Sequence, residues 1–129
     1  MNNNEIIYSF LRSNGFRLVD KDISMSFGDY YDILTNDSFE LRFSSSKSFE
    51  TVDIRSSQLN ENWYDLALVK ALLYNEKKLN NITTIEEHGI FLRRELVNIV
   101  ELFDGKNYLI TKKKLEELGN ERVKQMFPS

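Results

Sequence analysis

His88 is the only histidine in the chain and the clearest candidate for acid–base chemistry. Glu86 and Glu87 precede it, so a general base assisted by a carboxylate is one interpretation. Adjacent residues of a helix point about 100° apart, however, so neither glutamate would face the imidazole well. His88 also falls at the edge of an apolar stripe that runs through Ile85 and Leu92. We therefore favour a partly buried structural histidine over a catalytic base.

Other chemistries lack the residues that they need. The chain has no cysteine, which excludes disulfides, thiolate nucleophiles and cysteine-based metal sites. It has no phosphate-binding glycine loop, dinucleotide fingerprint or nucleophile elbow. Carboxylate pairs for hydrolysis could come from a set of acids in predicted strands, but such acids usually lie on the solvent-exposed face of a sheet. These acids are Asp29, Asp32, Glu40, Glu50 and Asp53. We predict no catalytic residue, no metal site and no cofactor.

Composition and charge restrict the class of protein. The 129 residues favour a single domain, 1–129. A net charge of −3 argues against a nucleic-acid binder that neutralises phosphates. No apolar run reaches the roughly 18 residues of a membrane span, and the N-terminus lacks the features of a signal peptide. We expect a cytoplasmic protein that binds neither nucleic acid nor membrane.

The elements that would position these side chains begin with one helix and a small sheet. Residues 3–14 have apolar side chains at helical spacing and end at Asn14–Gly15. From Phe16 to Ser56 the period changes to two, and the polar residues 35–38 form a turn between two of the runs. The alternating apolar residues are Ile23, Met25, Phe27, Tyr31, Ile33, Phe39, Leu41, Phe43, Val52 and Ile54. This pattern predicts three or four antiparallel strands.

Helical periodicity returns near residue 62. Asn62 is the predicted N-cap of a helix that is apolar around most of its circumference, as buried helices are. We therefore predict that Trp63, beside this cap, packs against the core. A second helix begins at Thr84, which has capping-box spacing to Glu87, and ends at residues 104–105.

A last helical region is predicted from about Thr111 to the end, with a break at Gly119–Asn120. Strands and helices are thus segregated along the chain. The predicted fold class is α+β: an N-terminal helix, a three- to four-stranded antiparallel meander, and three to four C-terminal helices packed on one sheet face.

The other sheet face would be open to solvent. One hairpin register pairs Leu41 with Ile54, and it also places Arg42 opposite Asp53 and Glu40 opposite Arg55, so that apolar and charge matching agree. If Tyr31 and Ile33 also face inward, then Tyr30, Asp32 and Leu34 face outward. A bulge at Gly28 would exchange the faces of Tyr30 and Tyr31.

The predicted partner-binding residues are Asp29, Tyr30, Asp32, Leu34, Glu40, Arg42, Asp53 and Arg55. Tyrosine and arginine among charges of both signs, on a flat surface, suit a protein contact better than a small-molecule pocket. An ordinary solvated sheet face is the alternative.

Short segments along the chain resemble those of small bacterial immunity proteins and their uncharacterised neighbours in polymorphic toxin systems. These segments are FGDYYDI at 27–33, LRF at 41–43, VDI at 52–54, NWYDL at 62–66 with LVKALL after it, and the closing ERVKQMFP. Members of this group often have an Asp-Arg pair after the third strand, where this chain has SSSKS. The resemblance implies a non-enzymatic cytoplasmic inhibitor that covers the active site of a toxin, and it implies no catalytic residue.

The distribution of charge bears on the partner. Residues 1–60 have nine acidic and six basic side chains, whereas residues 61–129 have eleven of each. An acidic N-terminal half would suit a basic toxin domain, such as a nuclease.

Two alternative functions remain open. The first is a small-molecule-binding protein or enzyme with a pocket between sheet and helices near His88 and Trp63. The second is a subunit that forms a homodimer through the open face.

Overall fold

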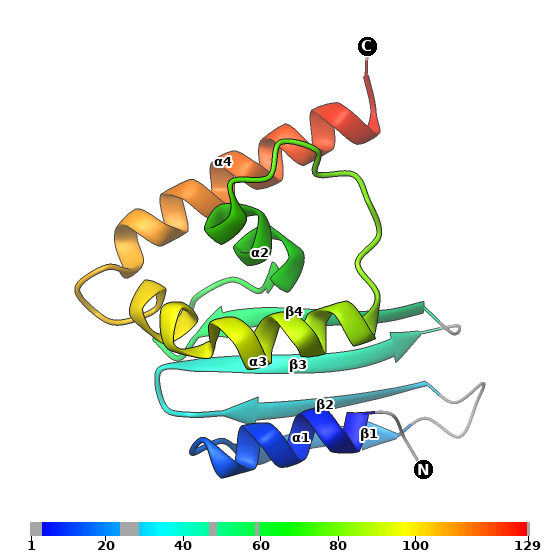
Figure 1. Cartoon of the computed structure of the whole chain (residues 1–129), viewed down its shortest axis with the longest axis vertical. Coiled ribbons are helices and arrows are strands. Elements are labelled where there is room, and N and C mark those ends of the chain that lie inside the picture. Colours follow the sequence, from blue (N-terminus) through cyan, green and yellow to red (C-terminus); the bar gives the residue numbers. More distant parts are fainter. Residues whose placement is uncertain (1–3, 24–28, 47–48, 59, 129) are drawn as a thin grey trace.

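The computed structural model describes residues 4–23, 29–46, 49–58 and 60–128. Four helices and five strands follow one another along these residues (Figure 1). Their bounds are α1 (Asn4–Ser13), β1 (Arg17–Ile23), β2 (Tyr30–Thr35), β3 (Phe39–Ser46), β4 (Phe49–Ser56), β5 (Tyr64–Asp65), α2 (Leu66–Tyr74), α3 (Ile85–Leu102) and α4 (Tyr108–Met126).

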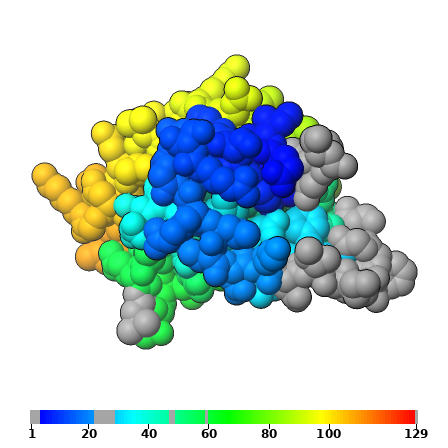
Figure 2. Space-filling model, turned by 90° about the horizontal axis from the view of Figure 1, so that it is seen from below, coloured from blue at the N-terminus to red at the C-terminus, as the bar shows by residue number. Residues whose placement is uncertain are grey.

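The strands form one antiparallel sheet in the order β1-β2-β3-β4-β5. Helices α1 and α3 lie side by side on one sheet face, and α2 and α4 lie beyond the β4 side of the sheet (Figures 1 and 2). The predicted α+β class and the order of helix, sheet and helices are confirmed. The predicted strand number is wrong, because the sheet has a fifth strand. That strand, β5, has only two residues and is too short to show a period of two.

The core lies between the sheet and the helices. The side chains of β3 and β4 that face α3 are completely buried, and they are Phe39, Leu41, Phe43, Val52 and Ile54. Around Phe39 the aromatic rings form a chain: its centroid is 5.5 Å from those of Phe16 and Phe103, and Phe103 is 5.5 Å from Tyr108. This chain links the residue before β1, strand β3, the C-cap of α3 and the first residue of α4, and each such ring contributes about 1.5–3 kcal/mol by burial.

Helix α2 begins later than the sequence predicts. Its N-cap is Asp65, whose Oδ1 accepts a hydrogen bond of 3.0 Å from the Ala67 amide, so the prediction of Asn62 as the cap is wrong. The reason is the pairing of Tyr64 with Ile54 in β4, which keeps the chain extended up to residue 65. The predicted cap of α3 is confirmed, because the Thr84 hydroxyl accepts from the Glu87 amide at 3.2 Å.

Helix α4 starts at Tyr108 rather than Thr111 and continues through the predicted break at Gly119 to Met126. Glycine in a helix interior costs about 1 kcal/mol relative to alanine. Here α4 packs along α2, and a Cβ built on Gly119 would lie 3.8 Å from the Leu68 side chain. Packing of this kind outweighs local propensity. Neither α4 nor any other described helix combines the length and apolar character needed to cross a membrane.

Candidate functional site

The sheet face opposite α1 and α3 is the candidate site. Its side chains, termed the open face, are Tyr31, Ile33, Glu40, Arg42, Ser44, Thr51, Asp53, Arg55 and Trp63. All nine are half-buried. Directly opposite residues share a face, so Ile33, Arg42 and Asp53 form one row across β2, β3 and β4.

Two ion pairs span the β3–β4 hairpin on this face. Arg42 Nη2 lies 2.9 Å from Asp53 Oδ2, and Arg55 Nη2 lies 2.6 Å from Glu40 Oε1. These contacts confirm the predicted register and the outward direction of all four side chains. Burial raises the pKa of Asp53, while the hydrogen bond from Arg42 acts in the opposite direction. The pairs contribute about 0.2–1 kcal/mol each and hold four long side chains in fixed directions.

Trp63 lies on the open face, and the prediction that it packs in the core is wrong. Its ring centroid is 4.3 Å from the guanidinium carbon of Arg42 and 4.3 Å from that of Arg55. Successive residues of an extended chain point to opposite faces. Because Tyr64 is paired with Ile54 on the core side, the residue before it falls on the side of Arg55. Trp63 is thus an aromatic ring held by two cations, each contact contributing about 0.5–1 kcal/mol.

Strand β2 presents the opposite faces from those predicted. Tyr30, Asp32 and Leu34, which were expected to point outward, lie on the side that α1 and α3 cover. Their partners on β3 are Ser45, Phe43 and Leu41, respectively. Leu34 is 0% exposed and cannot contact a partner protein. Tyr31 and Ile33 take the outward positions instead.

Asp29 lies beside the open face, and its predicted role in partner binding stays a prediction. It is half-buried and, together with Tyr31, Arg42 and Ser44, it lines a hollow of about 310 Å³. The predicted strand residues Met25 and Phe27, and Gly28 with its possible bulge, lie outside the described residues.

Tyr30 and Asp32 belong to a polar network beneath α1. The Tyr8 hydroxyl donates to Asp32 Oδ2 at 2.6 Å, and Asn4 Nδ2 donates to the Tyr30 hydroxyl at 2.7 Å. The Tyr30 hydroxyl in turn donates to Glu50 Oε2 at 3.3 Å. Burial raises the pKa of Tyr8, and the hydrogen bond to Asp32 raises it further. The network joins α1 to β2 and β4, so these residues have a structural role.

We expect Asp32→Ala to destabilise the fold rather than to weaken partner binding directly. The change leaves the mostly buried Tyr8 hydroxyl without its acceptor, which costs about 1–3 kcal/mol in free energy of unfolding. Urea denaturation measures the loss. Asp37→Asn is the matched control, because the Asp37 carboxylate is 77% exposed and its ion pair with Arg17 should contribute less than about 1 kcal/mol. Asparagine also tolerates the left-handed backbone of this position, whose φ is 76°. Equal losses in the two variants would contradict the structural role of Asp32.

His88 is buried, as predicted, with 2% of its surface exposed in the first turn of α3. Burial lowers its pKa to about 4, so the imidazole is neutral at pH 7. Neither neighbouring glutamate serves it as a hydrogen-bonded partner in the described structure: Glu87 instead accepts a hydrogen bond from the Thr84 hydroxyl. Trp63 lies on the other sheet face, so the predicted pocket shared by His88 and Trp63 does not form. The described residues include no group of three or more acids and histidines arranged for a metal ion.

Sequence reasoning thus missed five of the nine open-face residues, which are Tyr31, Ile33, Ser44, Thr51 and Trp63. A signal for the first two was available, because aligning Leu34 with Leu41 across the turn places Ile33 opposite Arg42. No local signal places Trp63, which depends on the pairing of β5.

Comparison of the chain with protein-family models, with curated proteins and with solved structures gave no match.

Proposed function

We propose that the protein is a non-enzymatic binding module that attaches to a protein partner through the open face, in the manner of an immunity protein. The observation that carries the proposal is that the Trp63 ring contacts the guanidinium groups of both Arg42 and Arg55. Tryptophan and arginine supply a large share of the binding energy in known interfaces. Because the ring contacts and ion pairs already restrict these side chains, little conformational entropy remains to be lost on binding.

The shape and charge of the open face support a protein partner. The face is a sheet surface with one hollow at its edge, and its ionic groups, Arg42 with Asp53 and Arg55 with Glu40, are already paired. Charge attraction therefore has to come from acids beside the face, such as Asp29 and the exposed Asp20. Together with the acid excess of residues 1–60, these favour a basic toxin domain, whose active site the module would cover.

The proposal is tested by capture of a partner from the source cells with two matched variants as baits. Ile33→Lys places a charge at the centre of the open face, and Val97→Lys places the same charge on α3, where the native valine is 75% exposed. Both variants should fold, because neither position is fully buried. The wild type and Val97→Lys should retain the same partner, and Ile33→Lys should lose it.

A partner that all three baits retain equally would contradict docking through the open face. The same variants address self-association. If the wild type sediments as a dimer that Ile33→Lys dissociates and Val97→Lys does not, the open face is a homodimer interface and the immunity proposal fails.

A further inference from the structure

A cleft of about 230 Å³ lies along the outer edge of β4, away from Trp63 and the two arginines that contact it. Four parts of the chain line it. They are the start of β4, the beginning of α2, the segment 79–83 together with the first turn of α3, and the end of α4. None of Arg42, Arg55 and Trp63 contributes to its lining. The cleft therefore lies apart from the Arg42–Trp63–Arg55 contacts, and Thr51 is the residue that it shares with the open face.

His88 lines this cleft and has an unpartnered polar atom. The residue is 98% buried, since 2% of its surface is exposed, and its Nδ1 atom has no hydrogen-bond partner among the described residues. Buried polar atoms almost always have a partner, so a buried ring nitrogen without one indicates a missing group. A bound molecule with a hydrogen-bonding group would supply it.

The backbone of β4 provides further hydrogen-bonding groups. The short strand β5 pairs only with Asp53 and Ile54 of β4. The outer edge of β4 at Phe49–Thr51 therefore has no strand neighbour in the described part of the chain, and it forms one wall of the cleft. An unpaired strand edge presents both N–H and C=O groups.

Three large apolar side chains surround the mouth of the cleft. Phe49 is 58% exposed, Ile82 is 75% exposed and Met126 is 53% exposed, and each comes from a different part of the chain. These three exposed apolar side chains and the buried His88 thus line the same cleft. Such a combination of an apolar wall and a few polar groups is typical of small-molecule sites.

Charge in the cleft favours neither an anion nor a cation. Its only described cation, Arg122, is paired with Asp65 at 2.8 Å, and Glu50 adds a further carboxylate. An anion would be repelled by these carboxylates. A cation would meet Arg122 and the N-terminal ends of α2 and α3, which carry positive partial charge. An uncharged molecule avoids both costs.

The volume limits the size of the ligand. A cavity of about 150 Å³ accommodates one benzene ring. The cleft, at about 230 Å³, thus has room for one ring with a small substituent.

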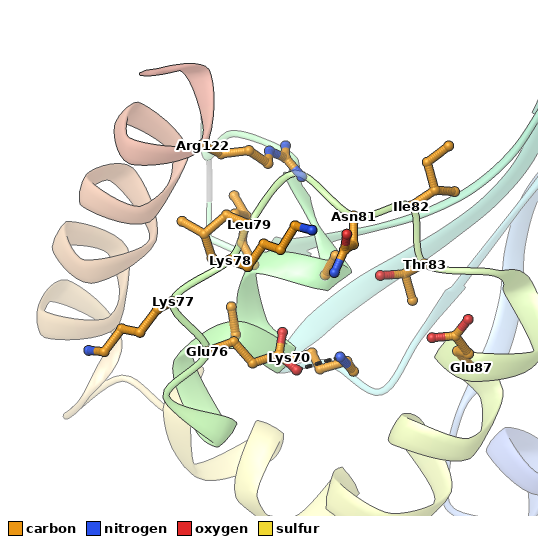
Figure 3. Close-up of a pocket in the computed structure, with 13 residues that line it drawn as sticks. Lys70, Glu76, Lys77, Lys78, Leu79, Asn81, Ile82, Thr83, Glu87 and Arg122 are labelled. Carbon is orange, nitrogen blue, oxygen red and sulfur yellow. Dashed lines mark hydrogen bonds and ion pairs between the residues drawn. The ribbon is translucent and has the colours of Figure 1, made fainter. Parts of the chain in front are cut away.

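Figure 3 shows the adjoining pocket, of about 340 Å³, which shares Leu79, Ile82 and Arg122 with the cleft. That pocket is more highly charged, and its Lys70–Glu76 ion pair, at 2.6 Å, is already formed.

We propose that the cleft binds a small uncharged molecule with one aromatic ring and one amide or hydroxyl group. The ring lies among Phe49, Ile82 and Met126, and the polar group forms hydrogen bonds with His88 and the edge of β4. This site does not depend on the proposed protein-binding function, because Arg42, Arg55 and Trp63, whose contacts support that function, do not line the cleft.

Benzamide is the probe for this site, since its amide both donates and accepts hydrogen bonds. Titration into the ¹⁵N-labelled protein should shift the amide resonances of Thr51, Leu79 and His88 saturably, with a dissociation constant in the millimolar range. Benzoate, which has the same shape and a negative charge, should bind at least about fivefold more weakly. The wild-type spectrum also serves as the reference for folding of each variant.

Two variants test the assigned contacts. His88→Phe removes the ring nitrogens and should weaken benzamide binding about fivefold, the value of one hydrogen bond. Met126→Ala removes an exposed apolar contact, so it should fold normally and weaken binding about threefold. Val97→Ala, on the exposed side of α3, is the control and should bind as the wild type does.

The proposal is overturned if benzamide causes no saturable shift at these residues. It is also overturned if benzoate binds as tightly as benzamide, or if the folded Met126→Ala variant retains wild-type affinity. Should His88→Phe fail to fold, the Met126→Ala and benzoate results still decide the matter.

Discussion

Trp63→Ala should leave the protein folded and remove most of its affinity for a partner captured through the open face. The ring is half-buried and contacts both Arg42 and Arg55. A central tryptophan of this kind contributes about 2 kcal/mol or more to binding, which corresponds to about a 30-fold rise in the dissociation constant. In the free protein the change removes two cation–aromatic contacts and part of the buried area, so the free energy of unfolding should fall by only about 1–2 kcal/mol.

Calorimetric titration against the captured partner measures the affinity, and urea denaturation measures the stability. Phe127→Ala is the matched control, because it removes an aromatic ring that is 73% exposed at the end of α4. That variant should bind the partner as the wild type does. A stability loss of about 3–5 kcal/mol in Trp63→Ala would indicate a core residue and would argue against an accessible ring. Unchanged affinity in a folded variant would remove Trp63 from the binding surface.

Leu34→Ala should lower the free energy of unfolding by about 2–5 kcal/mol, whereas Ile33→Ala should lower it by less than about 1.5 kcal/mol. Leu34 is 0% exposed and lies opposite the completely buried Leu41, so its truncation creates a cavity. Ile33 is half-buried on the open face, where solvent can fill the space that the side chain leaves.

Chemical denaturation of both variants gives the comparison directly. Because the two residues are neighbours on the same strand, their local backbone contexts are closely matched. Larger destabilisation by Ile33→Ala than by Leu34→Ala would show that the faces of β2 are assigned in the wrong order.

The α+β class and the β3–β4 hairpin could be predicted from the sequence, because independent features of the sequence indicate the same structure. In that hairpin the apolar pairs, such as Leu41 with Ile54, and the charged pairs, such as Arg42 with Asp53, select the same register. A shift by one residue would bury charge and expose apolar side chains at once. The capping pair of Thr84 and Glu87 is similarly local, because both residues lie within one helical turn.

The faces of β2 could not be settled in this way. Either face of the segment 30–34 is part polar and part apolar: one has Tyr30, Asp32 and Leu34, and the other has Tyr31 and Ile33. Burying the first set requires partners for a phenol and a carboxylate. Helix α1 supplies them through Asn4 and Tyr8, which are 26 and 24 residues away in the chain.

Sequence alone therefore determined the order of elements and the paired charges of β3 and β4, because neighbouring residues carry that information. Tertiary structure decided which residues of β2 are buried, where Trp63 lies, and that a cleft forms at His88. Each of these depends on contacts between distant segments: α1 with β2, β5 with β4, and the ends of α2, α3 and α4 around the edge of β4. Local periodicity reports which faces differ in polarity, but only the packed partners determine which face is buried.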